Sequence, residues 1–143
     1  IEYDQDFQGY FLDKIAQFHL NFEMIHSFND GNGRIGRVLI NYQLLRLGFP
    51  SVIIRDKEKQ EYYGSLRDYD SSHKTENMEV ILIMSLLESL HKRIAYLKSM
   101  KIVKLTDYAN KIGETSQAVL NKAKRQTVPA FREKGVWKIG VEY

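Results

Sequence analysis

Apolar residues recur every three or four positions through the first two thirds of the chain, a spacing that predicts amphipathic helices. A first helix over residues 11–25 has an apolar face made of Phe11, Ile15, Phe18, Phe22 and Ile25. Residues 26–33 are rich in Asn, Asp and Gly and predict a turn. A second helix follows, with a face made of Ile35, Val38, Leu39, Tyr42 and Leu45. Gly48 and Pro50 end this second helix.

Two further helices complete this predicted helical body. Residues 51–54 are expected to form a connecting piece, residues 61–68 a short helix and residues 70–73 a loop. One long helix is then predicted over residues 76–98, with a broad apolar face that we expect to lie in the core. That face consists of Val80, Ile83, Met84, Leu87, Leu90, Ile94 and Leu97.

Residues 104–143 follow a different pattern, with two short helices and then two short strands. Gly113 separates the helices, Ser116 can cap the second helix and Pro129 ends it. The β-rich stretches 130–132 and 136–139 flank a Gly-containing turn, which predicts a hairpin. This order of elements is typical of a winged helix-turn-helix. The predicted fold class is therefore all-α, a helical core over residues 1–98 followed by a small winged helix-turn-helix domain with a short β-hairpin over residues 99–143.

The distribution of charge supports this division into two modules. The chain has 143 residues, 21 Lys and Arg against 18 Asp and Glu, and a net charge of +3. Residues 1–97 carry a net −3, whereas residues 98–143 carry a net +6, which suits an acidic partner. The absence of cysteine excludes disulfides and thiolate metal sites. Because the chain has no apolar run long enough for a membrane span and no signal peptide at its start, we expect a cytoplasmic protein without a membrane partner.

The segment HSFNDGNGRIGR, residues 26–37, combines groups that suit phosphate chemistry. Two glycines flank Asn32 directly before a helix, where backbone N–H groups and the positive end of the helix dipole can hold an anion. Arg34 and Arg37 can bind further phosphate oxygens. Asp30 beside such a cradle suggests a bridging Mg²⁺, and His26 can act as a general base. Together these groups predict phosphoryl or nucleotidyl transfer.

This segment resembles the motif of Fic (filamentation induced by cAMP) proteins, H-x-F-x-[DE]-G-N-G-R-x-x-R, at every fixed position. The similarity extends over roughly residues 8–97 and includes LLRLGFP and EYYGSL. It implies an all-α core and a protein adenylyltransferase, which transfers AMP from ATP to a Ser, Thr or Tyr hydroxyl of a target protein. Such proteins usually have a helix and a β-hairpin flap before the motif helix. Only 25 residues precede His26, so we expect residues 1–98 to be the C-terminal part of a Fic-like core without its flap, which would weaken or abolish the activity of this fragment alone.

The resemblance also implies a role for each matching residue. His26 would accept the proton of the target hydroxyl, and Asp30 would hold Mg²⁺. Phe28 would anchor the loop in the core. The other implied roles are an anion hole from Gly31, Asn32 and Gly33, phosphate and pyrophosphate contacts from Arg34, a γ-phosphate contact from Arg37, and a nucleoside site from Tyr62, Tyr63 and Asp70. At Asp70 many members carry an adenine-contacting Asn.

The last forty or so residues are similar to small winged-helix modules of the excisionase-like kind. The residues that carry this similarity lie in the segments LTDYANKIG, SQAVLNKAKRQ and VPAFREKGVWKIG. Candidate DNA contacts are Lys122, Lys124, Arg125, Arg132, Lys134 and Lys138. A protein-docking or dimerisation module with solvated lysines is the alternative. For the whole chain two alternatives stay open: transfer of UMP, phosphocholine or phosphate, and a DNA-binding regulator whose Fic-like body senses nucleotide or forms a homodimer.

Overall fold

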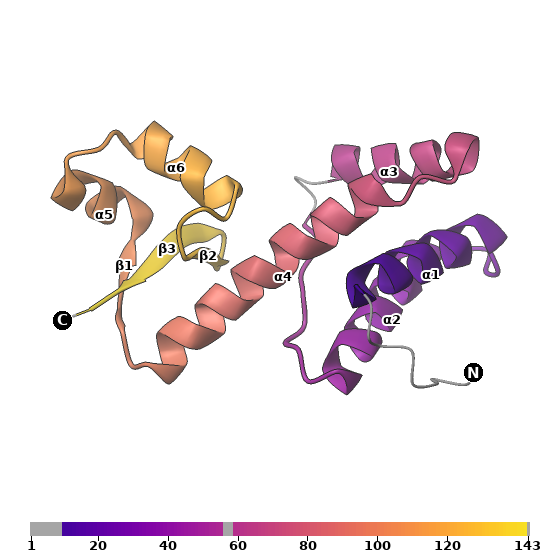
Figure 1. Ribbon diagram of the computed structural model, residues 1–143, viewed down its shortest axis with the longest axis horizontal. Coiled ribbons are helices and arrows are strands. Elements are labelled where there is room, and N and C mark those ends of the chain that lie inside the picture. Colours follow the sequence, from indigo (N-terminus) through magenta and orange to yellow (C-terminus); the bar gives the residue numbers. More distant parts are fainter. Residues whose placement is uncertain (1–9, 56–58, 143) are drawn as a thin grey trace. The chain divides into compact units, whose positions relative to one another are not determined.

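The computed structural model describes residues 10–55 and 59–142, which form six helices and one three-stranded antiparallel sheet (Figure 1). This confirms the predicted fold class of a helical body followed by a small module with a hairpin. The described residues pack into two compact units, which belong to Ile1–Ile83 (the N-terminal unit) and Met84–Tyr143 (the C-terminal unit). The division falls inside a helix, and the predicted domain boundary between residues 98 and 99 stays a prediction.

The N-terminal unit consists of helices α1 (Phe11–Ile25), α2 (Asn32–Arg46) and α3 (Lys59–Ser72) and the first turns of α4 (Glu76–Leu97). Helix α1 packs against both α2 and α3. The predicted bounds of α1 and α4 are confirmed, whereas α2 already begins at Asn32, inside the predicted turn. Gly48 has the positive φ of a residue that ends a helix. The loop predicted at residues 70–73 is wrong for its first three residues, because α3 continues to Ser72. Tyr69 anchors this extra turn by donating a hydrogen bond to Asn21 on α1 (2.5 Å).

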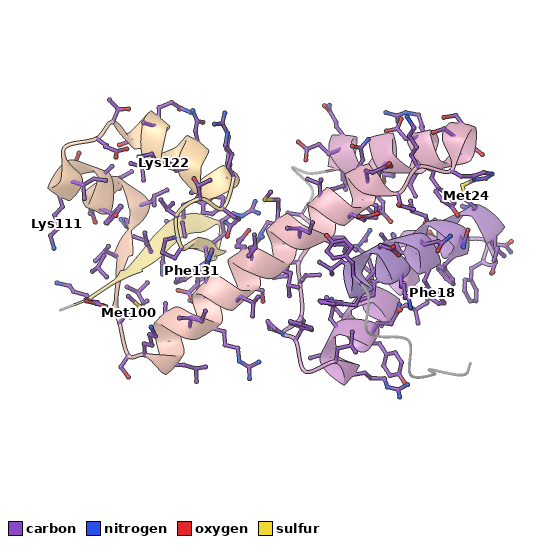
Figure 2. All side chains as sticks on the ribbon, viewed as in Figure 1. Phe18, Met24, Met100, Lys111, Lys122 and Phe131 are labelled. Carbon is purple, nitrogen blue, oxygen red and sulfur yellow. The ribbon has the colours of Figure 1, made fainter. Side chains whose placement is uncertain are left out.

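The apolar faces predicted for α1 and α2 are only partly the buried ones. Ile15 is buried as expected, but Phe18 and Ile25 are exposed, and Figure 2 labels Phe18 and Met24 among the side chains of α1. On α2 the exposed residues are Val38, Tyr42 and Leu45, and the buried ones are Asn32, Gly36, Ile40, Gln43 and Leu44. On α4, Val80, Ile94 and Leu97 are likewise exposed. Periodicity selects an apolar stripe, but the neighbouring helices decide which stripe they cover.

Gly36 lets α1 and α2 approach each other closely. A Cβ at this position would collide with the Glu23 carboxylate and would lie 2.7 Å from the ring of His19, which is buried. We expect Gly36→Ala to destabilise the N-terminal unit by about 1–3 kcal/mol, the usual cost of overpacking. Urea unfolding measures this change. The matched control is Gly64→Ala on α3, where the new Cβ would meet only Arg67 at 3.8 Å and should stabilise by about 0.5–1 kcal/mol through helix propensity. Equal effects at the two glycines would contradict the close approach.

The C-terminal unit contains the rest of α4, then β1 (Lys101–Lys104), α5 (Leu105–Ile112), α6 (Ser116–Lys124), β2 (Ala130–Glu133) and β3 (Val136–Val141). The sheet order is β1-β3-β2 with antiparallel pairing throughout (Figure 1). Its core is made of Leu105, Ala109, Val119, Ala123, Ala130 and Ile139. The two predicted helices and the hairpin are confirmed. The cap of α6 is Thr115, whose hydroxyl accepts from the Ala118 N–H (3.2 Å), rather than Ser116.

Strand β1 was not predicted, because half of its four residues are lysine and its partner β3 lies almost forty positions further along the chain. The C-terminal half of α4 also packs against this sheet, on which Figure 2 labels Phe131. The rings of Tyr96 and Phe131 lie 6.2 Å apart. Among the described residues, no helix has the length and apolar character needed to cross a membrane.

Candidate functional site

The glycine-rich loop joins α1 to α2 through two residues in the left-handed region. His26 ends α1 with φ 50° and ψ 49°, and its side chain is exposed. Gly31 stands before the first turn of α2 with φ 84°, a conformation that favours glycine. Its carbonyl accepts the Ile35 N–H (3.0 Å), the first hydrogen bond of the helix. The chain therefore turns sharply between His26 and the positive end of α2.

Asn32 holds this loop in shape from the inside. Its Oδ1 accepts the backbone N–H of Phe28 (3.0 Å), and its Nδ2 donates to the Phe28 carbonyl (2.6 Å). Asn32 is buried, whereas the ring of Phe28 is about half exposed. Phe28 therefore anchors the loop through its backbone and through the contact of its half-exposed ring with Phe22 (ring centroids 6.5 Å apart), and not through a ring buried in the core. The phosphate contact implied for the Asn32 side chain stays a prediction, since both polar atoms of the amide already bind the loop.

Asp30 and Arg34 lie on the open side of the loop. Asp30 Oδ1 accepts the Gly31 N–H (2.7 Å), and Oδ2 accepts from Arg34 Nη2 (3.1 Å). Their side chains are 92% and 74% exposed, so this ion pair contributes little to stability and a charged ligand can replace it. The part of the chain that the structure describes holds no group of three or more potential metal-ligating residues. A metal at Asp30 would therefore need ligands from a substrate and from water.

Arg37 lies on the inner side of the same turn, next to a polar cluster that the sequence did not predict. The cluster consists of His19 and Glu23 on α1 and Tyr62 on α3. His19 Nε2 and the Tyr62 hydroxyl are 2.8 Å apart. Burial lowers the pKa of the His19 imidazole to about 4, so this side chain is neutral at physiological pH. Glu23 and His19 are four positions apart on α1, a spacing that could have drawn attention to them.

The three residues expected at the nucleoside have different surroundings. Tyr62 is only 3% exposed, and its burial raises the pKa of its hydroxyl. Its ring is therefore part of the packed interior beneath the site and does not offer a surface to a ligand. Tyr63 is 50% exposed and meets the Tyr62 ring edge-on at 5.6 Å. Asp70 lies exposed in the last turn of α3. Only Tyr63 and Asp70 therefore offer accessible surface to a ligand.

The six candidate DNA contacts fall into two groups in the structure. Three already bind carboxylates: Lys122 binds Glu114 (2.7 Å), Lys138 binds Glu133 (2.7 Å) and Arg132 binds Glu88 (2.6 Å). The hydrogen bond from Lys138 is the main reason that the pKa of Glu133 falls to about 2. The other three, Lys124, Arg125 and Lys134, are exposed at the end of α6 and in the hairpin turn.

The model of the Fic/DOC family matches residues 2–44, which include the loop and most of α2. The chain is similar to a probable protein adenylyltransferase of Aquifex aeolicus, with 28% identity over 85% of this chain and 45% of the relative. It is also similar to protein adenylyltransferases of Nematostella vectensis, 51% identical over 36% of this chain and 12% of the relative, and of Caenorhabditis elegans, 42% identical over 38% and 11%. No solved structure matches.

The matched segment contains the loop residues from His26 to Arg37, which carry most of the reactive side chains of the site. Tyr62, Tyr63 and Asp70 lie beyond it. The chain spans about half the length of the Aquifex relative and about a tenth of the length of the two animal relatives.

Proposed function

We propose that this chain is the catalytic-loop part of a protein adenylyltransferase, which transfers AMP from ATP to a hydroxyl of a target protein. The observation that carries this proposal is the glycine-rich loop, held rigid by Asn32, which sets an exposed histidine beside the N-terminus of a helix. Relatives that are named protein adenylyltransferases support the same activity.

In this reaction the hydroxyl oxygen of the target attacks the α-phosphorus of ATP. A new P–O bond to the target forms, the bond between the α- and β-phosphates breaks, and pyrophosphate leaves. His26 takes the hydroxyl proton as a general base. The backbone N–H groups of residues 31–33 and Arg34 stabilise the charge on the phosphate oxygens at the positive end of α2, once Asp30 has released the Gly31 N–H that it accepts in the free loop. Arg37 binds the terminal phosphate.

The donor chemistry of the loop fits Mg²⁺. Asp30 offers an exposed carboxylate, and magnesium typically takes one or two carboxylates together with substrate phosphates and water. When bound, the ion would neutralise charge on the phosphates. Asp30 would give up its hydrogen bond with Arg34 to hold the ion, which frees Arg34 for the substrate.

Transfer of a labelled phosphate tests this function. The full-length protein is incubated with Mg²⁺ and a protein extract of its source organism, once with α-phosphate-labelled ATP and once with γ-phosphate-labelled ATP. We expect the α-label on protein and no γ-label. Label from the γ-position would indicate phosphate transfer, and label from UTP or CDP-choline in a parallel reaction would indicate the alternative donors. No label on protein from any donor would contradict the proposal.

We also propose that the C-terminal unit binds duplex DNA, as a second function. The sheet order β1-β3-β2 with two helices before the hairpin supports a winged helix-turn-helix. The exposed cations at the end of α6 and in the hairpin turn support contact with phosphates. The homodimer and the cytoplasmic location expected from the sequence stay predictions.

Salt dependence tests the DNA contact. We expect the double variant Lys124→Ala/Arg125→Ala to bind duplex DNA more weakly and to reduce the slope of log K against log salt by about 2, since each lost phosphate contact removes about 0.9. Fluorescence anisotropy over a salt series measures both quantities. The control Lys98→Ala/Lys101→Ala removes the same charge from the start of the module and should keep the slope. Equal loss in the two variants would indicate a general charge effect and contradict a contact by α6.

A further inference from the structure

Glu23 is a half-buried acid that the proposed reaction does not use. It lies on α1, and its Oε1 has no hydrogen-bond partner within the described part of the chain. The carboxylate occupies the space that the missing side chain of Gly36 leaves on α2. A buried carboxylate oxygen without a hydrogen bond is costly, so it needs compensation from a nearby charge.

Arg37 supplies that charge. The ideal Cβ position of Gly33 lies 3.3 Å from Arg37 Nη1 and 3.9 and 4.0 Å from the two carboxylate oxygens of Glu23. The guanidinium and the carboxylate therefore share one small space beside the glycine in the middle of the anion cradle. Burial raises the pKa of Glu23, and the charge of Arg37 is the strongest influence that opposes this rise. His19 adds no competing charge, because its imidazole is neutral.

We propose that Glu23 is a positioning residue, which holds the guanidinium of Arg37 beside Gly33 so that it faces the terminal phosphate of a nucleoside triphosphate. This inference rests on the proposed function. Arginine has a long side chain with many rotamers. If no partner held Arg37 in place, fixing its side chain on binding would cost conformational entropy and weaken its contact with the phosphate. Tyr62 supports the arrangement on the other side, since its hydroxyl contacts His19 and also lowers the pKa of Glu23. Gly36 is needed because a side chain there would displace the carboxylate.

Nucleotide selectivity tests this role in the purified protein. Affinities for ATP and for ADP are measured by calorimetry for the wild type, Glu23→Gln, Arg37→Ala and the double variant. We expect Glu23→Gln to reduce the preference for ATP over ADP by about tenfold, because it removes the charge that holds the guanidinium of Arg37 in place. The double variant should lose no more than Arg37→Ala alone. The control Asp13→Asn neutralises an exposed acid on the same helix and should keep the preference. Equal weakening of ATP and ADP by Glu23→Gln would indicate a merely structural role and overturn the inference.

A second measurement separates this inference from the proposed function. If the wild type binds no nucleotide, the adenylyltransferase proposal fails. The free energy of unfolding of the variants then tests by itself whether Glu23 and Arg37 interact. Urea unfolding of Glu23→Gln, Arg37→Gln and the double variant gives their coupling. We expect the double variant to lose clearly less stability than the two single losses combined. Strictly additive losses would show that the two side chains do not interact and would overturn the inference whatever the nucleotide result.

Discussion

Replacing His26 by alanine should reduce the transfer of α-label from ATP to protein by about 10²–10⁴-fold, the usual contribution of a general base. His26 is exposed at the end of α1, and among the described residues its side chain forms no hydrogen bond with the loop. The bonds between Asn32 and Phe28 and the ion pair between Asp30 and Arg34 remain in the variant. The loss should therefore appear in the rate of transfer, with ATP affinity almost unchanged. Initial rates of label incorporation and calorimetric ATP binding measure the two quantities.

His73→Ala is a matched control for this experiment. His73 is also an exposed histidine with positive φ (53°), at the end of α3, so the replacement removes the same side chain from the same backbone conformation. Both variants should lose similar, small amounts of stability in urea unfolding, whereas only His26→Ala should lose activity. Full activity of His26→Ala would show that another group takes the proton and would remove His26 from the proposed mechanism.

Glu88→Ala should destabilise the C-terminal unit by about 3–5 kcal/mol, because it removes the buried carboxylate that pairs with the largely buried charge of Arg132. The Glu88 carboxylate on α4 accepts the backbone N–H of Arg132 (2.9 Å), its Nε (3.1 Å) and its Nη2 (2.6 Å). The two side chains are only 8% and 15% exposed. Since the stability of a domain is about 5–15 kcal/mol, this loss is a large part of the total.

The fluorescence of Trp137 reports this loss in urea unfolding. It is the only tryptophan of the chain, and Arg132 lies over its ring at 4.8 Å. The control is Glu114→Ala, which breaks the more exposed ion pair with Lys122 and should cost about 0–1 kcal/mol. If both variants unfold at the same urea concentration as the wild type, burial of the Glu88–Arg132 pair contributes nothing and the prediction is wrong.

The elements and the chemistry of the loop could be predicted from the sequence because both depend on residues close together in the chain. Helices α2 and α5 end where glycine adopts positive φ, at Gly48 and Gly113, and hydrogen bonds from the next few residues complete each end. The hairpin turn at Gly135 is equally local. The loop places a histidine, a carboxylate and two arginines within twelve positions, so their proximity needs no knowledge of the fold.

By itself, then, the sequence determined which segments form helices and which chemistry the loop can support, but not the last turn of α3. The tertiary structure decided which faces are buried: Val38, Tyr42 and Leu45 fit an apolar stripe of α2, but α1 covers the stripe that contains Gly36 instead. It also decided that Arg132, a candidate DNA contact, is held by Glu88, which lies 44 positions earlier in the chain. The partners of Glu23 come likewise from α2 and α3. Burial and charge pairing are energies between groups distant in the chain, so spacing along the sequence carries no record of them.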